Sequence, residues 1–246
     1  MSKQSGLGDN FYVDQYDLSG DVGQLSKIGG GPASLEVTGI NKSAIERVGG
    51  LRTGEMSFNT FWNDVAGQAH VALSGLPTAD RITSYFHQPA IGAAAASQIS
   101  QQIDYAPTRG TDGSLTYATD AQSDGFGIEW GKQLTAGRRV DTTATNGTAI
   151  DTLASASFGC QAYLHVFAFT GTSVIVKIQD SADNSTFADL TSMTFGAISA
   201  VGAQRISVSN TSTVRRYIRV ITSTGTFSSI DFAVNFVKNE NAGVVF

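Results

Sequence analysis

Few residues of this chain belong to the types that catalyse reactions, and their spacing brings none of them together. Its 246 residues include three histidines and one cysteine. His70, His87 and His165 lie far apart, and none has a second histidine or a cysteine at the spacing of a metal site. Cys160 has no neighbours that would lower its pKa, so a small buried side chain explains it better than a nucleophile. A single cysteine cannot form an internal disulfide, which fits a protein made in a reducing cytoplasm.

The glycine-rich and acidic motifs also lack the context that their chemistry requires. Pro32 follows Gly29-Gly30-Gly31, where a phosphate-binding loop would have Lys-Ser or Lys-Thr. The run from Asp180 to Ser185 lacks the glycine and the terminal glutamate of a calcium loop. We therefore predict no catalytic residue, no metal ligand and no bound cofactor, and conclude that the chain is not an enzyme.

Composition and charge exclude further classes of protein. The chain is 41% hydrophobic and 15% charged, with a net charge of −5. An acidic balance excludes a strongly basic nucleic-acid binder. No stretch approaches the ~20 apolar residues of a membrane span, and the first residues carry no apolar signal region, so no membrane partner is expected.

Charge and local composition both change near Asn146. Residues 1–145 contain 15 acidic and 10 basic side chains, whereas residues 146–246 contain 6 of each. The segment 142–148 is small, polar and without periodicity, as a linker or long loop would be. The sequence therefore predicts two domains, residues 1–145 and residues 146–246.

The second domain alternates with the period of β-strands. Val174, Val176 and Ile178 alternate with polar residues, whereas residues 162–169 carry apolar side chains on both faces. Further runs span residues 204–209, 214–222 and 227–237, with turn residues between them. Short strands at this spacing indicate an antiparallel β-sandwich.

The first domain is predicted to be mainly β as well, with a helical contribution. Strands are expected over residues 52–62, 98–105, 114–122 and 126–132. Ile40, Ala44 and Val48 recur at helical spacing between a possible N-cap at Asn41 and Gly49, and residues 78–86 also have a helical pattern. The predicted fold class is mainly β: two antiparallel β-sandwich domains, the first with one packed α-helix.

A chain rich in strands and without catalytic groups is typical of a structural building block. Unpaired edge strands template pairing with another chain unless proline, charge or burial blocks them. With 4 prolines in the whole chain, its edges are lightly protected. Neighbouring copies in a symmetric ring could satisfy each other's edges.

Three stretches carry a resemblance to a known family. They are residues 35–58, with Gly49-Gly50-Leu51-Arg52-Thr53-Gly54-Glu55 at their centre, residues 103–115, and residues 131–138. Together they resemble the major tail tube proteins of long-tailed (siphovirus-like) bacteriophages, over about residues 10–141. Through residues 176–183, the second domain is similar to β-sandwich appendages of phage tail proteins.

The resemblance implies a virion tail protein, assembled in the cytoplasm of the host bacterium. Six subunits would form a ring, and stacked rings would make a hollow tube through which genomic DNA passes without specific binding. The first domain would be a tail-tube β-sandwich whose packed helix is residues 78–86, and it would contact other tail proteins. The second domain would be an outer decoration, so assembly is expected to survive its removal.

The resemblance also implies a contact between rings or subunits. A loop over residues 41–52 would reach an adjoining ring, which makes Asn41, Arg47, Gly49, Gly50 and Arg52 the candidate site residues. We expect Gly49 and Gly50 to adopt backbone angles that favour glycine. We also expect acidic side chains to line the channel, because DNA is held by cationic contacts and should slide past negative ones.

Two other functions remain open at this point. The chain could be a capsid decoration protein or a minor tail protein. Alternatively, the second domain could be a glycan-binding tail module, for which Tyr163, Phe167, Phe169 and Tyr217 are the candidate aromatic residues.

Overall fold

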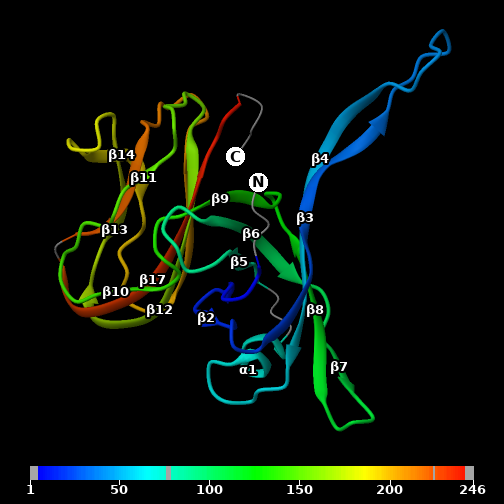
Figure 1. The fold of residues 1–246 in the computed structure, drawn as a ribbon, viewed down its shortest axis with the longest axis horizontal. Coiled ribbons are helices and arrows are strands. Elements are labelled where there is room, and N and C mark those ends of the chain that lie inside the picture. The colour runs from blue at the N-terminus through cyan, green and yellow to red at the C-terminus, as the bar shows by residue number, and fades with distance from the viewer. Residues whose placement is uncertain (1–4, 76–78, 224, 242–246) are drawn as a thin grey trace. The chain divides into compact units, whose positions relative to one another are not determined.

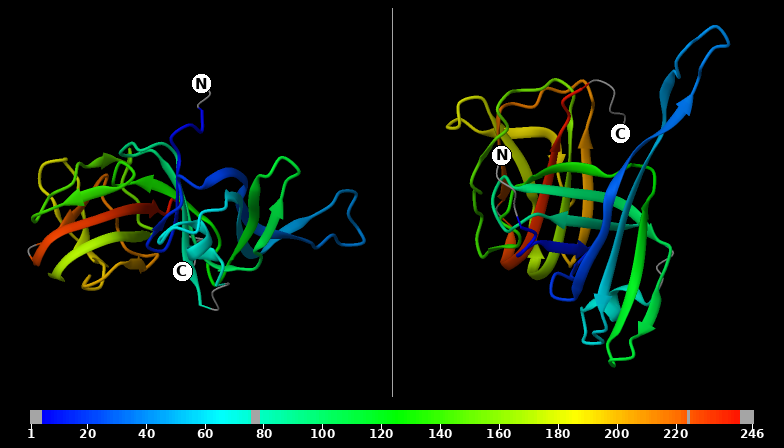
Figure 2. Two further views of the ribbon diagram at one scale, coloured as in Figure 1. Left: turned by 90° about the horizontal axis from the view of Figure 1, so that it is seen from below. Right: turned by 45° about the vertical axis from the view of Figure 1, so that its right-hand side comes forward.

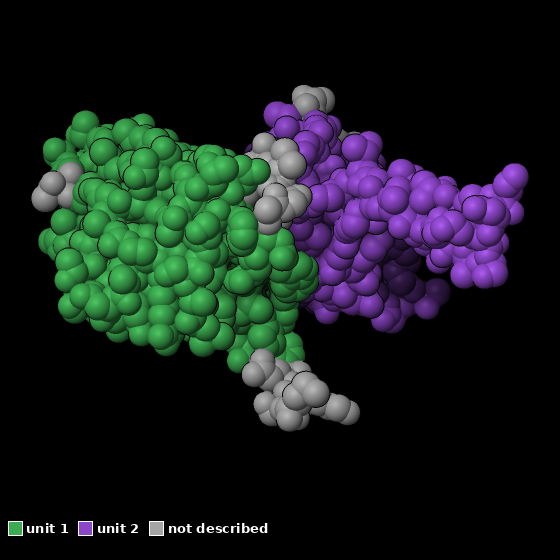
Figure 3. Space-filling model, turned by 90° about the horizontal axis from the view of Figure 1, so that it is seen from above, with its two compact units in different colours: residues 1–20, 82–97, 129–246 green, residues 21–81, 98–128 purple. Residues whose placement is uncertain are grey.

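The computed structural model describes residues 5–75, 79–223 and 225–241, and the fold is mainly β with antiparallel sheets. The chain divides into two compact units, coloured separately in Figure 3. Unit 1 comprises residues 1–20, 82–97 and 129–246, and unit 2 comprises residues 21–81 and 98–128. Among the described residues no helix is long and apolar enough to cross a membrane.

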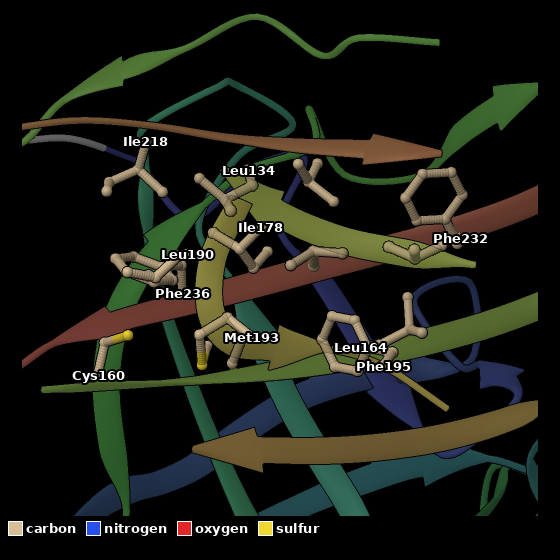
Figure 4. Packing of buried hydrophobic residues seen from close by; sticks show 14 of the residues in the cluster. Leu134, Cys160, Leu164, Ile178, Leu190, Met193, Phe195, Ile218, Phe232 and Phe236 are labelled. Atoms are coloured by element: carbon tan, nitrogen blue, oxygen red, sulfur yellow. The ribbon is translucent and has the colours of Figure 1, made fainter. Parts of the chain in front are cut away.

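Unit 1 contains a β-sandwich whose two sheets enclose the largest hydrophobic core. One sheet has the strand order β11-β16-β13-β14, and the facing strands are in the order β15-β12-β17. The bounds are β11 (Ile150–Asp151), β12 (Cys160–Ser173), β13 (Val176–Ser181), β14 (Ala188–Thr194), β15 (Gly202–Val208), β16 (Tyr217–Thr222) and β17 (Thr226–Lys238). Leu164, Ile178, Ile218 and Phe232 are among the fully buried side chains between the sheets (Figure 4). The predicted β-sandwich of the C-terminal half is confirmed.

The strands β12 and β17 are buried on both faces, which explains the double apolar pattern in the sequence. Their second face meets β1 (Asn10–Val13), β5 (Arg81–Phe86) and β6 (Ala94–Gln102). Three more strands extend the ladder: β9 (Glu129–Gln133) and β10 (Arg139–Asp141) pair with β17, and β2 (Tyr16–Asp17) pairs with β1. Tyr12, Phe86, Ala95 and Ala233 form a second buried cluster there, against which Phe167 packs. Residues before Asn146 therefore complete the burial of strands that follow it.

Unit 2 is built around one antiparallel sheet. Its strands are β3 (Val22–Glu36), β4 (Arg47–Phe61), β7 (Ala106–Arg109), β8 (Leu115–Ser123) and the last part of β6. Met56, Phe58 and Thr60 are buried and alternate along β4 with partly exposed residues, as expected for a sheet with one covered face. The short helix α1 (Ala69–Leu73) is attached to this unit by a hydrogen bond from the Ala69 amide to Asp21, 2.9 Å long.

Both predicted helices are wrong. Residues 40–48 form the turn between β3 and β4 and the start of β4, and the described part of residues 78–86 contains strand β5; Thr78 lies outside the described residues. β-branched and aromatic side chains such as Ile82, Thr83 and Tyr85 favour strands, and pairing with β1 overrides the helical spacing. The α-helix of the structure is α1, which the sequence pattern does not mark.

The prediction of two sandwiches holds in part. Unit 1 has the two facing sheets, whereas unit 2 has one sheet and α1. Unit 1 draws residues from both sides of Asn146, and the division into domains 1–145 and 146–246 stays a prediction.

Strands on both sides of Asn146 pair with each other, so the structure predicts a different effect of removing residues 146–246 than the sequence did. Val140 pairs with Asp231, and Gln133 pairs with Asn235, so strands before Asn146 are hydrogen-bonded to β17. We predict that a chain ending at Thr145 loses this ladder, exposes the cluster around Tyr12 and Phe86, and aggregates or unfolds. Circular dichroism and hydrogen exchange of that fragment test this: cooperative unfolding with protected β5 and β9 amides would contradict it.

Candidate assembly surface

The strands β3 and β4 extend far beyond the sheet of unit 2. β4 pairs with β8 from Glu55 to Phe61, but its pairing with β3 continues to Arg47, opposite Glu36. Residues 31–53 therefore form a two-stranded ribbon with which none of the other described strands pairs, visible in Figures 1 and 2. At about 3.4 Å per residue, residues 47–54 alone extend for roughly 27 Å. We call residues 31–53 the ribbon.

Local hydrogen bonds shape the tip of the ribbon. The Val37 amide donates to the Glu46 carbonyl at 3.0 Å, and the Glu46 amide donates to the Thr38 hydroxyl at 3.0 Å. The Lys42 ammonium lies 3.0 Å from a Glu46 carboxylate oxygen. The tip is thus a turn held by local hydrogen bonds, and its side chains are exposed.

The ribbon exposes large apolar side chains. Ile40 is fully exposed and Leu51 is 87% exposed. The other exposed apolar side chains of the ribbon are Leu35, Val37, Ile45 and Val48. A two-stranded hairpin is marginally stable by itself in water, and contiguous exposed apolar surface marks an interaction site. This surface is the strongest candidate functional site of the chain.

Two glycines fix the ribbon where it leaves the sheet. Gly30 and Gly54 are paired across β3 and β4. A Cβ atom on Gly54 would lie 2.5 Å from the Ile128 amide nitrogen and 2.8 Å from Gln98 Oε1. On Gly30 it would lie 2.1 Å from the Thr53 carbonyl oxygen. Backbones approach so closely here that no side chain fits on either residue.

The five predicted site residues lie together in the ribbon, but not in the predicted loop. Asn41 is in the turn at the tip, whereas Arg47, Gly49, Gly50 and Arg52 belong to β4. The expectation of unusual glycine backbone angles is wrong, because neither Gly49 nor Gly50 has a positive φ. Whether these residues contact another ring stays a prediction.

Sequence reasoning missed the apolar side chains of the ribbon. The signal was available, because Leu35 and Val37 alternate with Glu36 and Thr38 at the period of a strand. The helical spacing of Ile40, Ala44 and Val48 led instead to the prediction of a helix. In the structure Leu35 lies opposite Val48 and covers Gly50, whose Cβ position is 3.1 Å from the Leu35 side chain.

An unpaired strand edge accompanies the ribbon. Among the described strands, β3 pairs with β4 and with no other strand. Its outer edge therefore presents backbone amides and carbonyls along most of the sheet of unit 2. Such an edge is a template for a strand of another chain.

Several residues that could do chemistry have structural hydrogen bonds inside unit 1. His165 is fully buried; its Nδ1 donates to the Asp14 carbonyl at 2.7 Å, so its Nε2 accepts from the Ser84 hydroxyl at 2.8 Å. Ser84 then accepts from Ser97 at 2.6 Å, and Ser97 accepts from the Asn235 amide at 2.9 Å. This chain of hydrogen bonds ties β5, β6, β12 and β17 to the residue that follows β1, and burial of His165 favours its neutral imidazole.

The remaining candidates are also occupied by structural contacts. Cys160 is buried, and burial raises the pKa of its thiol, which disfavours the reactive thiolate. Glu129 is buried and accepts hydrogen bonds from Gln161 at 2.9 Å and from Arg205 at 3.2 Å. Asp183 accepts the Ser185 and Thr186 amides of its own turn. In the described part of the chain no three His, Cys, Asp or Glu side chains group as metal ligands.

Aromatic residues proposed for a glycan site are used in packing as well. Tyr163 is fully buried, and Phe167 packs against Tyr12 with ring centroids 4.8 Å apart. Phe169 packs against the sandwich core, and Tyr217 lies under the Arg216 guanidinium. These four residues do not form an exposed aromatic face.

No protein-family model matches the chain, and no curated protein matches it in sequence. A structure of the tail of an empty GTA particle with C6 symmetry has 14% identity and a TM-score of 0.40, over 51% of this chain and 97% of that chain. The crystal structure of the SPP1 Dit protein has 12% identity and a TM-score of 0.32, over 94% of this chain and 99% of that one. The phage p2 baseplate in its activated conformation with Sr has 11% identity and a TM-score of 0.37 over the same shares, 94% and 99%. Similarities this low carry no conclusion about function.

The glycine pair at the base of the ribbon yields a prediction. Gly54→Ala should destabilise unit 2 by about 1–3 kcal/mol, because the added methyl group overlaps the Ile128 amide. Gly49→Ala is the matched control, since its Cβ would lie 3.4 Å from Pro32, an ordinary contact. Urea unfolding midpoints and hydrogen exchange of β4 amides measure the difference. Equal midpoints for the two variants would refute the assigned role of Gly54.

The buried histidine yields a second prediction. Burial lowers the pKa of His165 to about 4, although the hydrogen bond to the Asp14 carbonyl opposes the shift. Between the unfolded pKa of about 6.5 and pH 4 the unfolded chain binds one more proton, so stability falls as the pH falls, by about 3 kcal/mol in total. Above pH 6.5 this contribution is constant.

His165→Gln removes the titrating group and serves as the control for that measurement. Urea titrations of both proteins from pH 8 to pH 4.5 should show a steeper loss for the wild type. The difference between the two slopes isolates the contribution of His165 from that of every other group in the protein. Parallel curves would show that His165 is not held neutral.

Proposed function

We propose that this chain is a structural protein of a bacteriophage tail that polymerises into the tail tube. In this proposal six copies form a ring, and stacked rings make the conduit for genomic DNA between the virion and the host. The chain acts on no substrate and holds no cofactor. Its partners are other copies of itself and other tail proteins.

The ribbon is the observation that carries the proposal. Its exposed apolar side chains and the free edge of β3 are unfavourable in an isolated copy, and both are satisfied when a second copy covers them. Full burial of a leucine or isoleucine contributes about 1.5–3 kcal/mol, so a few such contacts per copy suffice for association. The motif that carries the family resemblance, Gly49 to Glu55, lies in the ribbon and at its base.

Electrostatics supports a conduit. Unit 2 contains ten acidic and six basic side chains, a net charge of −4, whereas unit 1 contains eleven and ten. One face of the sheet of unit 2 presents polar residues: Gln24, Lys27, Glu55, Ser57, Asn59, Thr116, Asp120 and Gln122. Lys27 is paired with Glu55 at 2.7 Å, which leaves the Asp120 carboxylate in excess. A face of amides, hydroxyls and surplus negative charge offers DNA no counterion release, so we assign it to the lumen.

Imaging and sedimentation of the purified protein test the proposal. We expect hollow tubes with six-fold symmetry in electron micrographs and fast-sedimenting species above a critical concentration. Ile40→Asp with Leu51→Asp should raise that concentration at least tenfold, because two exposed apolar anchors are lost. Leu153→Asp is the matched control, since Leu153 is 80% exposed in unit 1 and should not affect assembly.

Other outcomes separate the rival functions. Compact trimers would favour a capsid decoration protein, and a protein that stays monomeric at high concentration would exclude self-assembly. Tubes that form equally well with both ribbon substitutions would remove the ribbon from the contact.

A further inference from the structure

One surface of unit 1 combines an exposed indole with a phenol ring. Trp130 of β9 is 51% exposed, although tryptophan usually buries most of its ring. Its ring lies edge-to-face with that of Tyr85 on β5, with centroids 6.4 Å apart and planes at 76°. β6 lies between these two strands (Figure 1), and its Ala96, opposite Trp130, is fully buried. The small side chain of Ala96 lets the two rings meet across β6.

Hydrogen bonds hold the Tyr85 ring in place. Its hydroxyl donates to Asp9 Oδ2 at 2.5 Å. The other carboxylate oxygen, Asp9 Oδ1, accepts from the Gln88 amide at 3.0 Å and lies 3.0 Å from His87 Nδ1. The phenol is therefore fixed before any ligand arrives, and a preformed surface loses little conformational entropy on binding.

An unpaired cation lies beside the indole. Lys132 is exposed and follows Trp130 by two residues on β9, so both side chains lie on one face of the strand, about 7 Å apart along it. Opposite Lys132 stands Ala94, whose side chain is small. Within the part of the chain that the structure describes, the Lys132 ammonium forms no ion pair and no hydrogen bond. It can therefore bind an anion.

The size of the apolar patch favours a small ligand over a second protein. Trp130 is the only exposed large apolar side chain of β1, β5, β6 and β9, whose residues are all described. A stable protein interface buries about 800 Å² per partner around an apolar centre. One indole among polar neighbours suits a ligand that has one apolar face and a polar rim.

A sugar ring has this chemistry. The C–H groups on one face of a pyranose carry partial positive charge, whereas the face of an indole is negative. The hydroxyl groups of the sugar stay at the rim, in contact with water. A carboxylate or phosphate on the same sugar can reach the Lys132 ammonium and form a charge-assisted hydrogen bond.

We propose that Trp130, Tyr85 and Lys132 form a binding site for an acidic saccharide, a sugar that carries a carboxylate or a phosphate. The indole stacks on the sugar ring, Tyr85 holds the indole in place, and Lys132 binds the anionic group. A single copy of unit 1 contains the whole site, so binding does not depend on self-assembly. None of the four aromatic residues that the sequence suggested for a glycan site belongs to it.

An array of acidic oligosaccharides and their neutral counterparts tests the site. It holds oligosaccharides with uronate, sialate or sugar phosphate groups, each beside its methyl ester or dephosphorylated form. We expect the full chain to bind acidic members more strongly than their neutral counterparts. The best-bound oligosaccharide should also change the tryptophan fluorescence of the Trp62→Phe variant, in which Trp130 is the remaining one of the two tryptophans.

Two variants separate the contributions of the indole and the ammonium. Trp130→Ala should raise the Kd about tenfold or more for the acidic and the neutral form alike, because the stacking surface is lost. Lys132→Gln should raise the Kd about fivefold for the acidic form and leave the neutral form unchanged. Lys132 is exposed, so its variant should fold even if Trp130→Ala does not. Trp62→Phe is the matched control, since Trp62 lies in unit 2 and should not affect the Kd.

Three results would overturn the inference. The first is that no acidic oligosaccharide binds more strongly than its neutral counterpart. The second is that both variants bind like the wild type, which would place the ligand elsewhere. The third is that no saccharide binds and Trp130→Ala weakens assembly, which would make this face a protein contact. The proposed tail tube does not depend on this site, and a chain that fails to assemble can still be tested for saccharide binding.

Discussion

The conformation of unit 2 depends on one constraint: a two-stranded ribbon cannot bury its own side chains. Pairing between the two strands satisfies the backbone amides and carbonyls that lie between them. The two faces of the ribbon and the outer edge of each strand still need a covering partner. In the sheet proper, β8 pairs with the second edge of β4 and a buried layer covers Met56 and Phe58. In the ribbon, the described residues provide neither a third strand nor a covering layer. In the proposed assembly, a second copy supplies the surface that covers the ribbon.

Unit 1 differs from the ribbon because its central strands, β12 and β17, are covered on both faces. Such strands read as near-continuous apolar runs, and any polar group among them must be hydrogen-bonded. His165 meets this requirement through the Asp14 carbonyl and Ser84, the Asn235 amide nitrogen through Ser97, and Glu129 through Arg205 and Gln161. The first set of hydrogen bonds joins β5 and β6 with β12 and β17, and the second joins β9 with β12 and β15.

The sequence predicted the class of fold and most strands because period-two alternation is a local signal. Residues 174–178 and 227–237 read as strands for the same reason that they are strands: one face or both are buried. The prediction of secondary structure from the sequence failed where a helical pattern and a strand pattern overlap. Ile40, Ala44 and Val48 have helical spacing, yet Val48 pairs with Leu35, and that long-range pairing determines the structure. The candidate residues Asn41, Arg47 and Arg52 were found through a family resemblance, whereas the apolar residues beside them follow only from exposure in three dimensions.

The proposed association of acidic copies poses an electrostatic problem that the distribution of charge would reduce. Two copies of unit 2, each with a net charge of −4, repel each other as they approach. At physiological ionic strength the Debye length is about 8 Å, so diffuse repulsion is screened while contacts at hydrogen-bond distance are not. The ribbon contains three basic and two acidic side chains, a net charge of +1, so in the proposed assembly it approaches an acidic copy with less repulsion than the rest of unit 2. The same arrangement leaves the polar face of the sheet with a surplus carboxylate. A subunit can in this way attract its own kind at one end of a sheet and repel a polyanion along its face.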